Sequence, residues 1–229
     1  AGSWLEPHLR AFITGTWEMF ITPTLTILVV GFFSLVLIQP VAGELSDLLA
    51  LCTQKALSRG GWLTGALLGG TFLPLVMMGV HQSLVPIHQQ LVDMLGMNPL
   101  FPILCMAGAG QVGAAVAVFF KTQNTRLKTI VKTALPVGLL GIGEPLIYGV
   151  TLPLFKPFIG ACLGAAVGGA VVAAFHVTSA IPFGVSGLVL FLALSNLHSA
   201  IFYGLGFLTA LAAGFAITWK LGFDDPPNE

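Results

Sequence analysis

Long apolar stretches separated by short polar ones make up most of the chain. Residues 19–38 contain no charged side chain, and a helix needs about 20 mostly apolar residues to cross the hydrocarbon core of a bilayer. Residues 41–59 differ, because Glu44, Asp47 and Lys55 alternate there with leucines at helical spacing, as in a helix that lies on a membrane surface. The pattern predicts an all-α integral membrane protein, built as a multi-span helical bundle.

The same pattern divides the chain into segments with different relations to the membrane. Apolar runs long enough to span a bilayer alternate with polar, basic or Gly/Pro-rich sequence. In order, we expect a span at 17–40, an amphipathic surface helix at 41–59, a span and a polar broken segment at 61–96, a span at 99–120, a basic cytoplasmic loop at 121–132, a re-entrant hairpin at 137–157, a span at 158–176, one or more spans at 186–220 and a disordered tail at 221–229.

One of these expected spans carries a ridge of small residues. Gly160, Gly164 and Gly168 follow one another at intervals of four. Small residues at this spacing let two helices in a membrane approach closely. We therefore expect the ridge to be a helix-packing face.

Composition and charge narrow the class of protein. Hydrophobic residues make up 56% of the chain and charged residues 8%, with a mean hydropathy of +0.95, which excludes an ordinary soluble domain. The formal net charge is zero, so no overall field points to nucleic acid. Lys121, Arg126, Lys128 and Lys132 crowd 121–132 with no acid among them, which places that segment in the cytoplasm. The same charges would also suit an acidic or phosphorylated partner.

Residues that could bind metal are too dispersed to predict a metal site. Cys52, Cys105 and Cys162 lie far apart, which predicts neither a disulfide framework nor a zinc site. His81 and His88 are seven residues apart, but no third ligand follows them. We expect no metal and no cofactor.

The segment 141–157, GIGEPLIYGVTLPLFKP, contains an isolated acid, Glu144. No other carboxylate occurs between Asp93 and Asp224. The segment's three prolines and three glycines disfavour a continuous helix, and irregular backbone at membrane depth is tolerated only where it packs in protein or lines a watery cavity. We expect a broken helix or re-entrant hairpin with a buried Glu144 near its tip. Such a carboxyl could accept a hydroxyl's hydrogen bond or take its proton; alternatively, it caps a helix or ties two hairpins together.

A second polar cluster begins at His81 and Gln82, directly after an apolar run, and is interrupted by a proline. A polar, Pro-interrupted patch of this kind is another candidate for a cavity lining. Farther along, we expect His88, Gln89 and Asp93 to meet solvent or lipid headgroups.

Four short motifs that begin at residue 141 resemble those of a known family. They are, in order, GIGEP, IYG, LPL and KPF. The sugar permeases of the glucose superfamily of the bacterial phosphotransferase system carry GITEP, IYGV, LPL and KPF in their membrane IIC domain. The family's central Thr is Gly143 here, and its Gly-x-His is matched by Gly79, Val80 and His81. Among members of this family, the motif sequence resembles most that of the N-acetylmuramic acid permeases. The resemblance implies a multi-pass protein of the bacterial cytoplasmic (inner) membrane, with residues 1–229 as the later part of a IIC domain.

The resemblance also implies an activity. In that family the IIC domain moves a bound sugar inward, and a phosphocysteine on a IIB domain phosphorylates the sugar's 6-hydroxyl, with phosphate supplied by phosphoenolpyruvate through a IIA protein. It implies a protein-phosphocysteine-sugar phosphotransferase, as part of the full enzyme II complex. The implied partners are a sugar, the phosphorylated IIB domain, normally on the same polypeptide, a IIA protein, the lipid bilayer and a second copy in a homodimer. The donor cysteine is not in this chain, because the sequence around Cys52 lacks the spacing and the soluble domain that a IIB site needs.

By the same resemblance, His81 and Glu144 belong to the sugar site as candidate catalytic residues. Glu144 would orient or deprotonate the hydroxyl, and His81 would hold the hydroxyls in line. Gln82, Gln111 and Gly143 complete the candidate substrate-binding set. Gln111 could contact a hydroxyl, since an amide both donates and accepts, or it could bond a neighbouring helix. The lactyl carboxylate of N-acetylmuramic acid would need a cationic or amide partner. The candidates are His81, Gln82 and Gln111.

Two other functions stay open from the residues alone. A proton-coupled secondary transporter or channel could use Glu144 as its proton carrier. A structural or receptor-like subunit would leave that acid unexplained. The sequence has no phosphate-binding G-x-x-x-x-G-K motif, so any phosphate must come from elsewhere.

Overall fold

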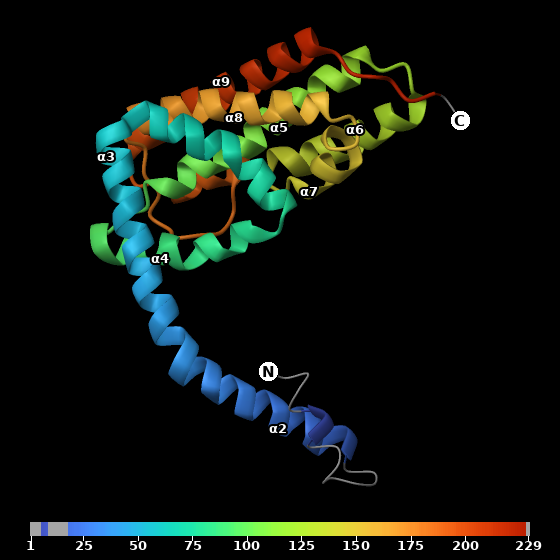
Figure 1. The fold of residues 1–229 in the computed structure, drawn as a ribbon. Helices are drawn as coiled ribbons and strands as arrows, with labels where there is room; N and C mark the ends of the chain where they lie inside the picture. The colour runs from blue at the N-terminus through green and yellow to red at the C-terminus, as the bar shows by residue number, and fades with distance from the viewer. Residues whose placement is uncertain (1–5, 9–17, 228–229) are drawn as a thin grey trace. The chain divides into compact units, whose positions relative to one another are not determined.

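The computed structural model describes residues 6–8 and 18–227 and divides the chain into two units, 1–48 and 49–229. In the first unit, the α-helix α2 (Glu18–Phe33) continues through a π-helix, η1 (Ser34–Ile38), into the start of α3 (Gln39–Met77) (Figure 1). Most apolar side chains in the described part of this unit are exposed, as suits a helix that faces lipid. The first residue of the expected span at 17–40 lies outside the described residues.

No break separates the expected span at 17–40 from the expected surface helix at 41–59. The π-helix ends at Ile38, two residues before Pro40. Pro40 has no amide to continue the α-helical bonding pattern, yet the helix continues past it. The backbone leaves helical geometry at Gly61, where φ is 46°. The hydroxyl of Thr64 donates to the carbonyl of Ala56 (2.9 Å), which ties the two sides of this kink together.

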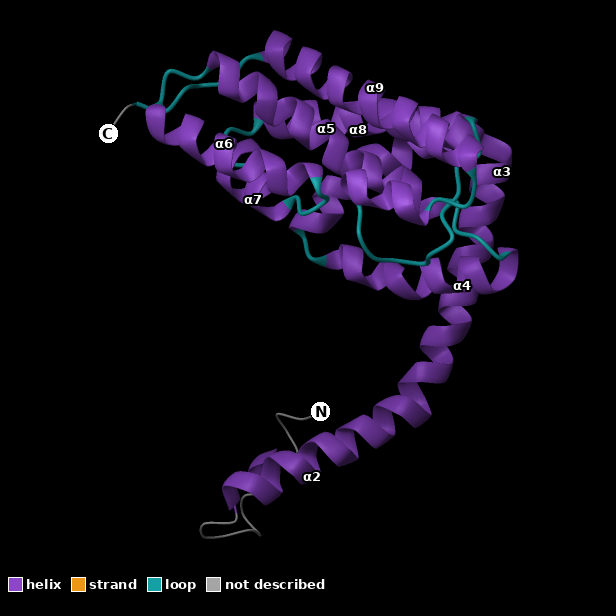
Figure 2. Ribbon diagram, turned by 180° about the vertical axis from the view of Figure 1, so that it is seen from behind, coloured by secondary structure: helices purple, strands orange, loops and turns teal. Residues whose placement is uncertain are grey.

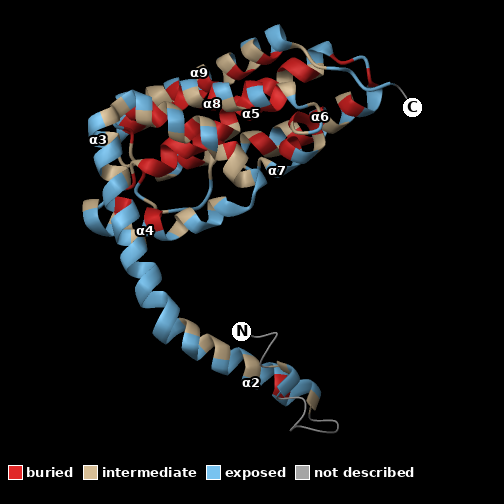
Figure 3. Cartoon of the chain, in the orientation of Figure 1, coloured by how far each residue is buried: buried red, intermediate tan, exposed pale blue. Residues whose placement is uncertain are grey.

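The core of the second unit is made by three long helices, α5 (Leu100–Lys121), α8 (Lys156–Ala174) and α9 (Leu197–Leu221), which pack against one another (Figures 1 and 2). Figure 3 shows that buried residues concentrate on α5 and α8.

The ridge of small residues on α8 lies at a helix–helix contact, as predicted. A methyl group added at Gly164 would lie 2.6 Å from the backbone nitrogen of Gly214 on α9. One added at Gly168 would meet Ala210, also on α9, at 2.5 Å. Since these contacts involve backbone or Cβ atoms, the close approach of α8 and α9 depends on the absence of side chains at these glycines.

The basic segment 121–132 is mostly helical, not a loop. The side chain of Asn124 accepts a hydrogen bond from the amide of Leu127 (2.8 Å), which caps the start of α6 (Thr125–Leu139) and satisfies one of the free amides of a helix N-terminus.

The disorder expected of the C-terminal tail is wrong for its described part, 222–227. The Asp225 carboxylate accepts hydrogen bonds from the hydroxyl of Thr122 and the amide of Gln123, and the Asn124 amide donates to the carbonyl of Pro227. The prolines and acids of this segment led to the expectation of disorder. The hydrogen bonds instead hold the segment against the turn between α5 and α6.

The 141–157 segment is broken, as predicted. After α6 and a short turn, the chain makes one helical turn, α7 (Glu144–Leu146), then a π-helix, η3 (Ile147–Thr151), and a second turn before α8 begins. The long loop after α8 contains a 3-10 helix, η4 (Gly187–Ala193), and leads into α9.

The predicted fold class is confirmed. Among the residues that the structure describes there is no β-strand, only isolated bridges that join Ser179 to Asn98 and to Leu194. The following helical stretches are long and apolar enough to cross a membrane: Glu18–Met77, Leu100–Lys121, Lys156–Ala174 and Leu197–Leu221.

Candidate substrate-binding site

A cavity of about 220 Å³ in the second unit collects all five predicted site residues. It is bounded by α3, by the 3-10 helix η2 (Val80–Leu84), by α4 (Val85–Leu95), by α5, by the 141–157 segment and by the loop before η4. The residues that supply polar groups to its lining are His81, Gln82, His88, Gln111, Glu144 and Ser186, together with the backbone of Gly141, Gly143 and Gly184. Segments far apart in sequence thus converge on one cavity.

Glu144 lines the cavity but is exposed, so the expectation of a buried carboxyl is wrong for this chain. It is the first residue of α7, a helix of one turn that follows the turn after α6 and continues directly into η3. No described residue forms a hydrogen bond or an ion pair with its carboxylate. Both oxygens are therefore free to accept bonds from a ligand in the cavity.

His81 and Gln82 lie side by side on η2 at the same cavity. The His81 Nε2 atom is 3.1 Å from the Gln82 Nε2 atom. The His81 ring contacts the Phe72 ring edge to face, with the ring centroids 6.3 Å apart. The other ring nitrogen of His81, Nδ1, is buried and has no partner among the described residues. An unpaired buried polar atom costs about 1–3 kcal/mol, which a bound ligand or a water could recover. The Gln82 side chain is exposed and can turn toward a ligand.

Gln111 is directed to the 141–157 segment by a hydrogen bond. Its side chain is only 1% exposed, and its Nε2 donates to the carbonyl of Gly143 at 3.1 Å. The amide thus bonds a neighbouring segment and also lines the cavity, and its contact with a sugar hydroxyl stays a prediction. A methyl group added at Gly143 would lie 2.7 Å from the Gln111 Oε1 atom. The missing side chain at Gly143 is therefore what lets Gln111 reach the segment.

We expect Gly143→Ala and Gln111→Ala to act through the same contact. Each single change should weaken severalfold the binding of the sugar that the motif predicts, because the first displaces the Gln111 amide and the second removes it. The double variant should bind no more weakly than the worse single variant, since neighbouring residues that share one interaction are not additive. Equilibrium binding of radiolabelled sugar to all four proteins measures this. Additive losses would show that the two residues act independently.

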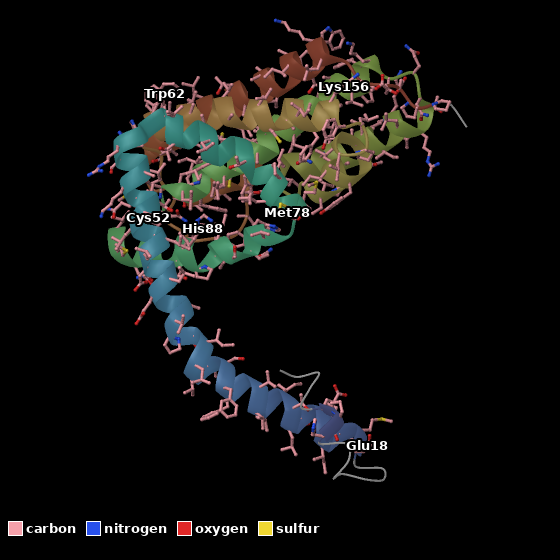
Figure 4. The ribbon with its side chains drawn as sticks, in the orientation of Figure 1. Glu18, Cys52, Trp62, Met78, His88 and Lys156 are labelled. Carbon is pink, nitrogen blue, oxygen red and sulfur yellow. The ribbon has the colours of Figure 1, made fainter. Side chains whose placement is uncertain are left out.

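His88 is buried, so the expectation that it meets solvent or headgroups is wrong. Figure 4 labels His88 on α4. Its side chain is 1% exposed and lines the cavity. The ring contacts those of Phe101 and Phe183, with centroids at 5.6 Å and 5.9 Å, and its Nδ1 lies 3.0 Å from the Asn98 Nδ2 atom. Helix α4 is not one of the candidate spans, and burial lowers the pKa of His88 to about 4. The imidazole is therefore neutral at pH 7.

The loop before η4 completes the cavity, and sequence reasoning did not assign its residues to the site. The hydroxyl of Ser186 donates to the carbonyl of Gly141 at 2.9 Å. Gly141 has a positive φ of 98°, and a methyl group there would lie 2.4 Å from the Ser186 Oγ atom, so only glycine allows this approach. The polar sequence of 176–186, interrupted by Pro and Gly, could have assigned this loop to the site, because broken polar stretches in a membrane chain indicate cavity linings.

The lining would hold a ligand mainly through neutral polar groups. Glu144 is its one acid, and none of the described residues around the cavity is Lys or Arg. The described part of the chain has no group of three or more His, Cys, Asp and Glu side chains placed to bind a metal.

A membrane bundle with a broken, acid-bearing segment at an internal polar cavity is the architecture of a transporter. The family model of the phosphotransferase system EIIC domain matches residues 5–165, which is more than half of the chain. The chain belongs to this family.

Individual members of the family are similar in sequence to this chain. A putative phosphotransferase system EIIBC component, YbbF, from Bacillus subtilis is 47% identical over 224 residues, which cover 97% of this chain and 49% of the relative. Two proteins named MurNAc-GlcNAc-specific EIIBC components, from Staphylococcus haemolyticus and Staphylococcus epidermidis, are each 43% identical over 219 and 221 residues. The alignments cover 95% and 96% of this chain and 46% of each relative. The chain thus spans about half the length of these relatives. No solved structure matches it.

Proposed function

We propose that the chain is part of a phosphotransferase-system sugar permease that transports N-acetylmuramic acid, or a sugar containing it, and delivers it as the 6-phosphate. The observation that carries the proposal is the convergence of His81, Gln82, Gln111, Gly143 and Glu144 on one cavity in a chain of the EIIC family. The names of the staphylococcal relatives support the choice of sugar.

The geometry suits a role for Glu144 at the reacting hydroxyl. Its carboxylate has no partner among the described residues and faces the cavity. In the proposed step, the sugar's O6 attacks the phosphorus of a phosphocysteine on a IIB domain, the sulfur–phosphorus bond breaks, the thiolate leaves, and the hydroxyl proton passes to Glu144. Phosphoryl transfer depends mainly on positioning and charge stabilisation. A correctly positioned base raises the reaction rate about 10²–10⁴-fold.

The remaining residues of the site hold the sugar in this proposal. Gln82 offers an exposed amide that can donate to the lactyl carboxylate, and Gln111 presents the carbonyl oxygen of its side chain, because its nitrogen is bonded to Gly143. The phosphorylated IIB domain, a IIA protein and a second copy of the permease complete the proposed complex.

Sugar phosphorylation tests the proposal. Membranes that contain the complete protein would be supplied with phosphoenolpyruvate, the general phosphotransferase proteins and a panel of sugars. The proposal expects N-acetylmuramic acid 6-phosphate, formed only when phosphoenolpyruvate is present. Uptake without phosphorylation that follows a proton gradient would contradict it and would make Glu144 a proton carrier.

A further inference from the structure

His88 is a cavity residue whose hydrogen-bonding direction is fixed by a neighbour. Asn98 Oδ1 accepts the backbone N–H groups of Leu100 (2.9 Å) and Phe101 (3.1 Å), which identifies its other side-chain atom, Nδ2, as the NH₂ group. This group donates to the carbonyl of Pro182 at 2.6 Å and lies 3.0 Å from His88 Nδ1. An NH₂ group has no lone pair to offer, so His88 Nδ1 must accept. The proton of the neutral ring is therefore on Nε2.

This Nε2–H group is left for a ligand. None of the described residues forms a hydrogen bond with Nε2, although the ring is buried and lines the cavity. Nε2 is not one of the fully buried side-chain atoms that lack a partner, so its N–H is open to the cavity, where an acceptor on a bound molecule can take its hydrogen bond. Since the ring is held by Asn98 on one side and by two phenylalanine rings on the other, the donor has a fixed position before any ligand arrives.

We infer that His88 recognises the acetamido group of an N-acetylated hexosamine, by donating from Nε2–H to its carbonyl oxygen, with Asn98 as the positioning residue that fixes the tautomer. The inference rests on the proposed function and deepens it, because it assigns the part of the site that separates 2-acetamido sugars from 2-hydroxy sugars.

The surroundings of His88 match both ends of an acetamido group. The rings of Phe101 and Phe183, which contact His88 and each other, form an apolar wall for the methyl group. Nε2–H supplies the donor for the carbonyl oxygen. The carboxylate of a lactyl side chain fits this place less well, because the neutral ring brings no positive charge and the same lining carries Glu144.

Binding measured without phosphoenolpyruvate tests the inference on the complete protein in membrane vesicles. The probes are radiolabelled N-acetylglucosamine and glucose, which differ in the 2-acetamido group. His88→Leu should weaken N-acetylglucosamine binding about tenfold or more, as expected for a lost hydrogen bond to a buried group, and should change glucose binding by less than about twofold. His88→Gln should keep most of the preference, because the Gln side chain can place an N–H near the position of Nε2. His198→Leu is the matched control, because His198 is exposed and does not line the cavity.

Nitrogen-15 spectra of histidine-labelled wild-type protein give a readout that does not need a variant that folds. The inference expects the His88 proton on Nε2 and expects N-acetylglucosamine, but not glucose, to shift that resonance. Asn98→Asp keeps the oxygen that caps α5 but accepts a proton from Nδ1, so it should move the ring proton to Nδ1 and abolish the preference. A His88 proton on Nδ1 in the wild type, or equal losses for both sugars in His88→Leu, would overturn the inference. If the wild type binds no N-acetylated sugar, N-acetylmuramic acid included, the proposed function fails first and this inference fails with it.

Discussion

Replacing Glu144 with Gln is expected to slow phosphoenolpyruvate-dependent sugar phosphorylation by at least about a hundredfold, because a placed base contributes about 10²–10⁴-fold to such a step. The Gln side chain keeps an oxygen that can accept a hydroxyl's hydrogen bond. Sugar binding should therefore fall by less than about tenfold. Initial rates of sugar phosphate formation and equilibrium binding, measured on the same membranes, separate the two effects.

Asp93→Asn is the matched control for this experiment. Asp93 is an exposed carboxylate on α4 that accepts a hydrogen bond from Gln89 and does not line the cavity. Its replacement should leave phosphorylation within about twofold of wild type, as is usual for surface substitutions. A Glu144→Gln protein that phosphorylates at the wild-type rate would show that Glu144 is not the base, whatever its effect on binding.

Gly164→Leu is expected to destabilise the protein by about 3 kcal/mol or more, at the upper end of the cost of overpacking a core. A first carbon at this position would lie 2.6 Å from the backbone nitrogen and 2.7 Å from the Cα of Gly214. Backbone atoms of a packed helix cannot move aside as a flexible side chain can. Helices α8 and α9 would have to separate, and thermal unfolding in detergent should show a large fall in Tm.

The control for this change is Gly43→Leu on α3. Nothing lies within 4 Å of a methyl group placed there, and the residue is exposed. The Tm of this variant should equal or exceed that of wild type, because leucine favours a helix more than glycine does. Similar losses of Tm in both variants would mean that the close approach of α8 and α9 contributes little to stability.

Local features of the sequence were sufficient to predict much of the fold. The break in 141–157 follows from its prolines and glycines, and the packing face on α8 follows from glycines at intervals of four. Both depend on residues near one another in the chain, which a sequence displays directly. The membrane class follows equally from the length of the apolar runs.

Features that depend on distant contacts could not be predicted in this way. His88 looked polar and accessible, yet it is buried because Asn98 and Phe183, ten and more than ninety residues farther on, pack against it. The described part of the C-terminal tail, 222–227, looked free, yet Thr122 and Asn124 bond to it. Partners of this kind are visible only in the folded chain.

The candidate site shows the same division. Residues that match the family motif, such as Glu144 and His81, were found from sequence and do share one cavity. Ser186 was missed, since a single serine in a broken loop has no distinguishing pattern. The exposure of Glu144 was also missed, because isolation in apolar sequence indicates burial only when other segments cover the residue.

Protection of a thiol in the cavity tests the central claim, that this cavity is the sugar site, most directly. Gly108 lines the cavity on α5, and nothing lies within 4 Å of a side chain begun there. Gly108→Cys would be made in a protein whose other cysteines, Cys52, Cys105 and Cys162 included, are replaced by alanine, with Gly43→Cys in the same background as the control. Saturating sugar, without phosphoenolpyruvate, is predicted to slow alkylation at position 108 severalfold and to leave position 43 unchanged. Equal alkylation rates at position 108 with and without a sugar that the protein binds would contradict the account.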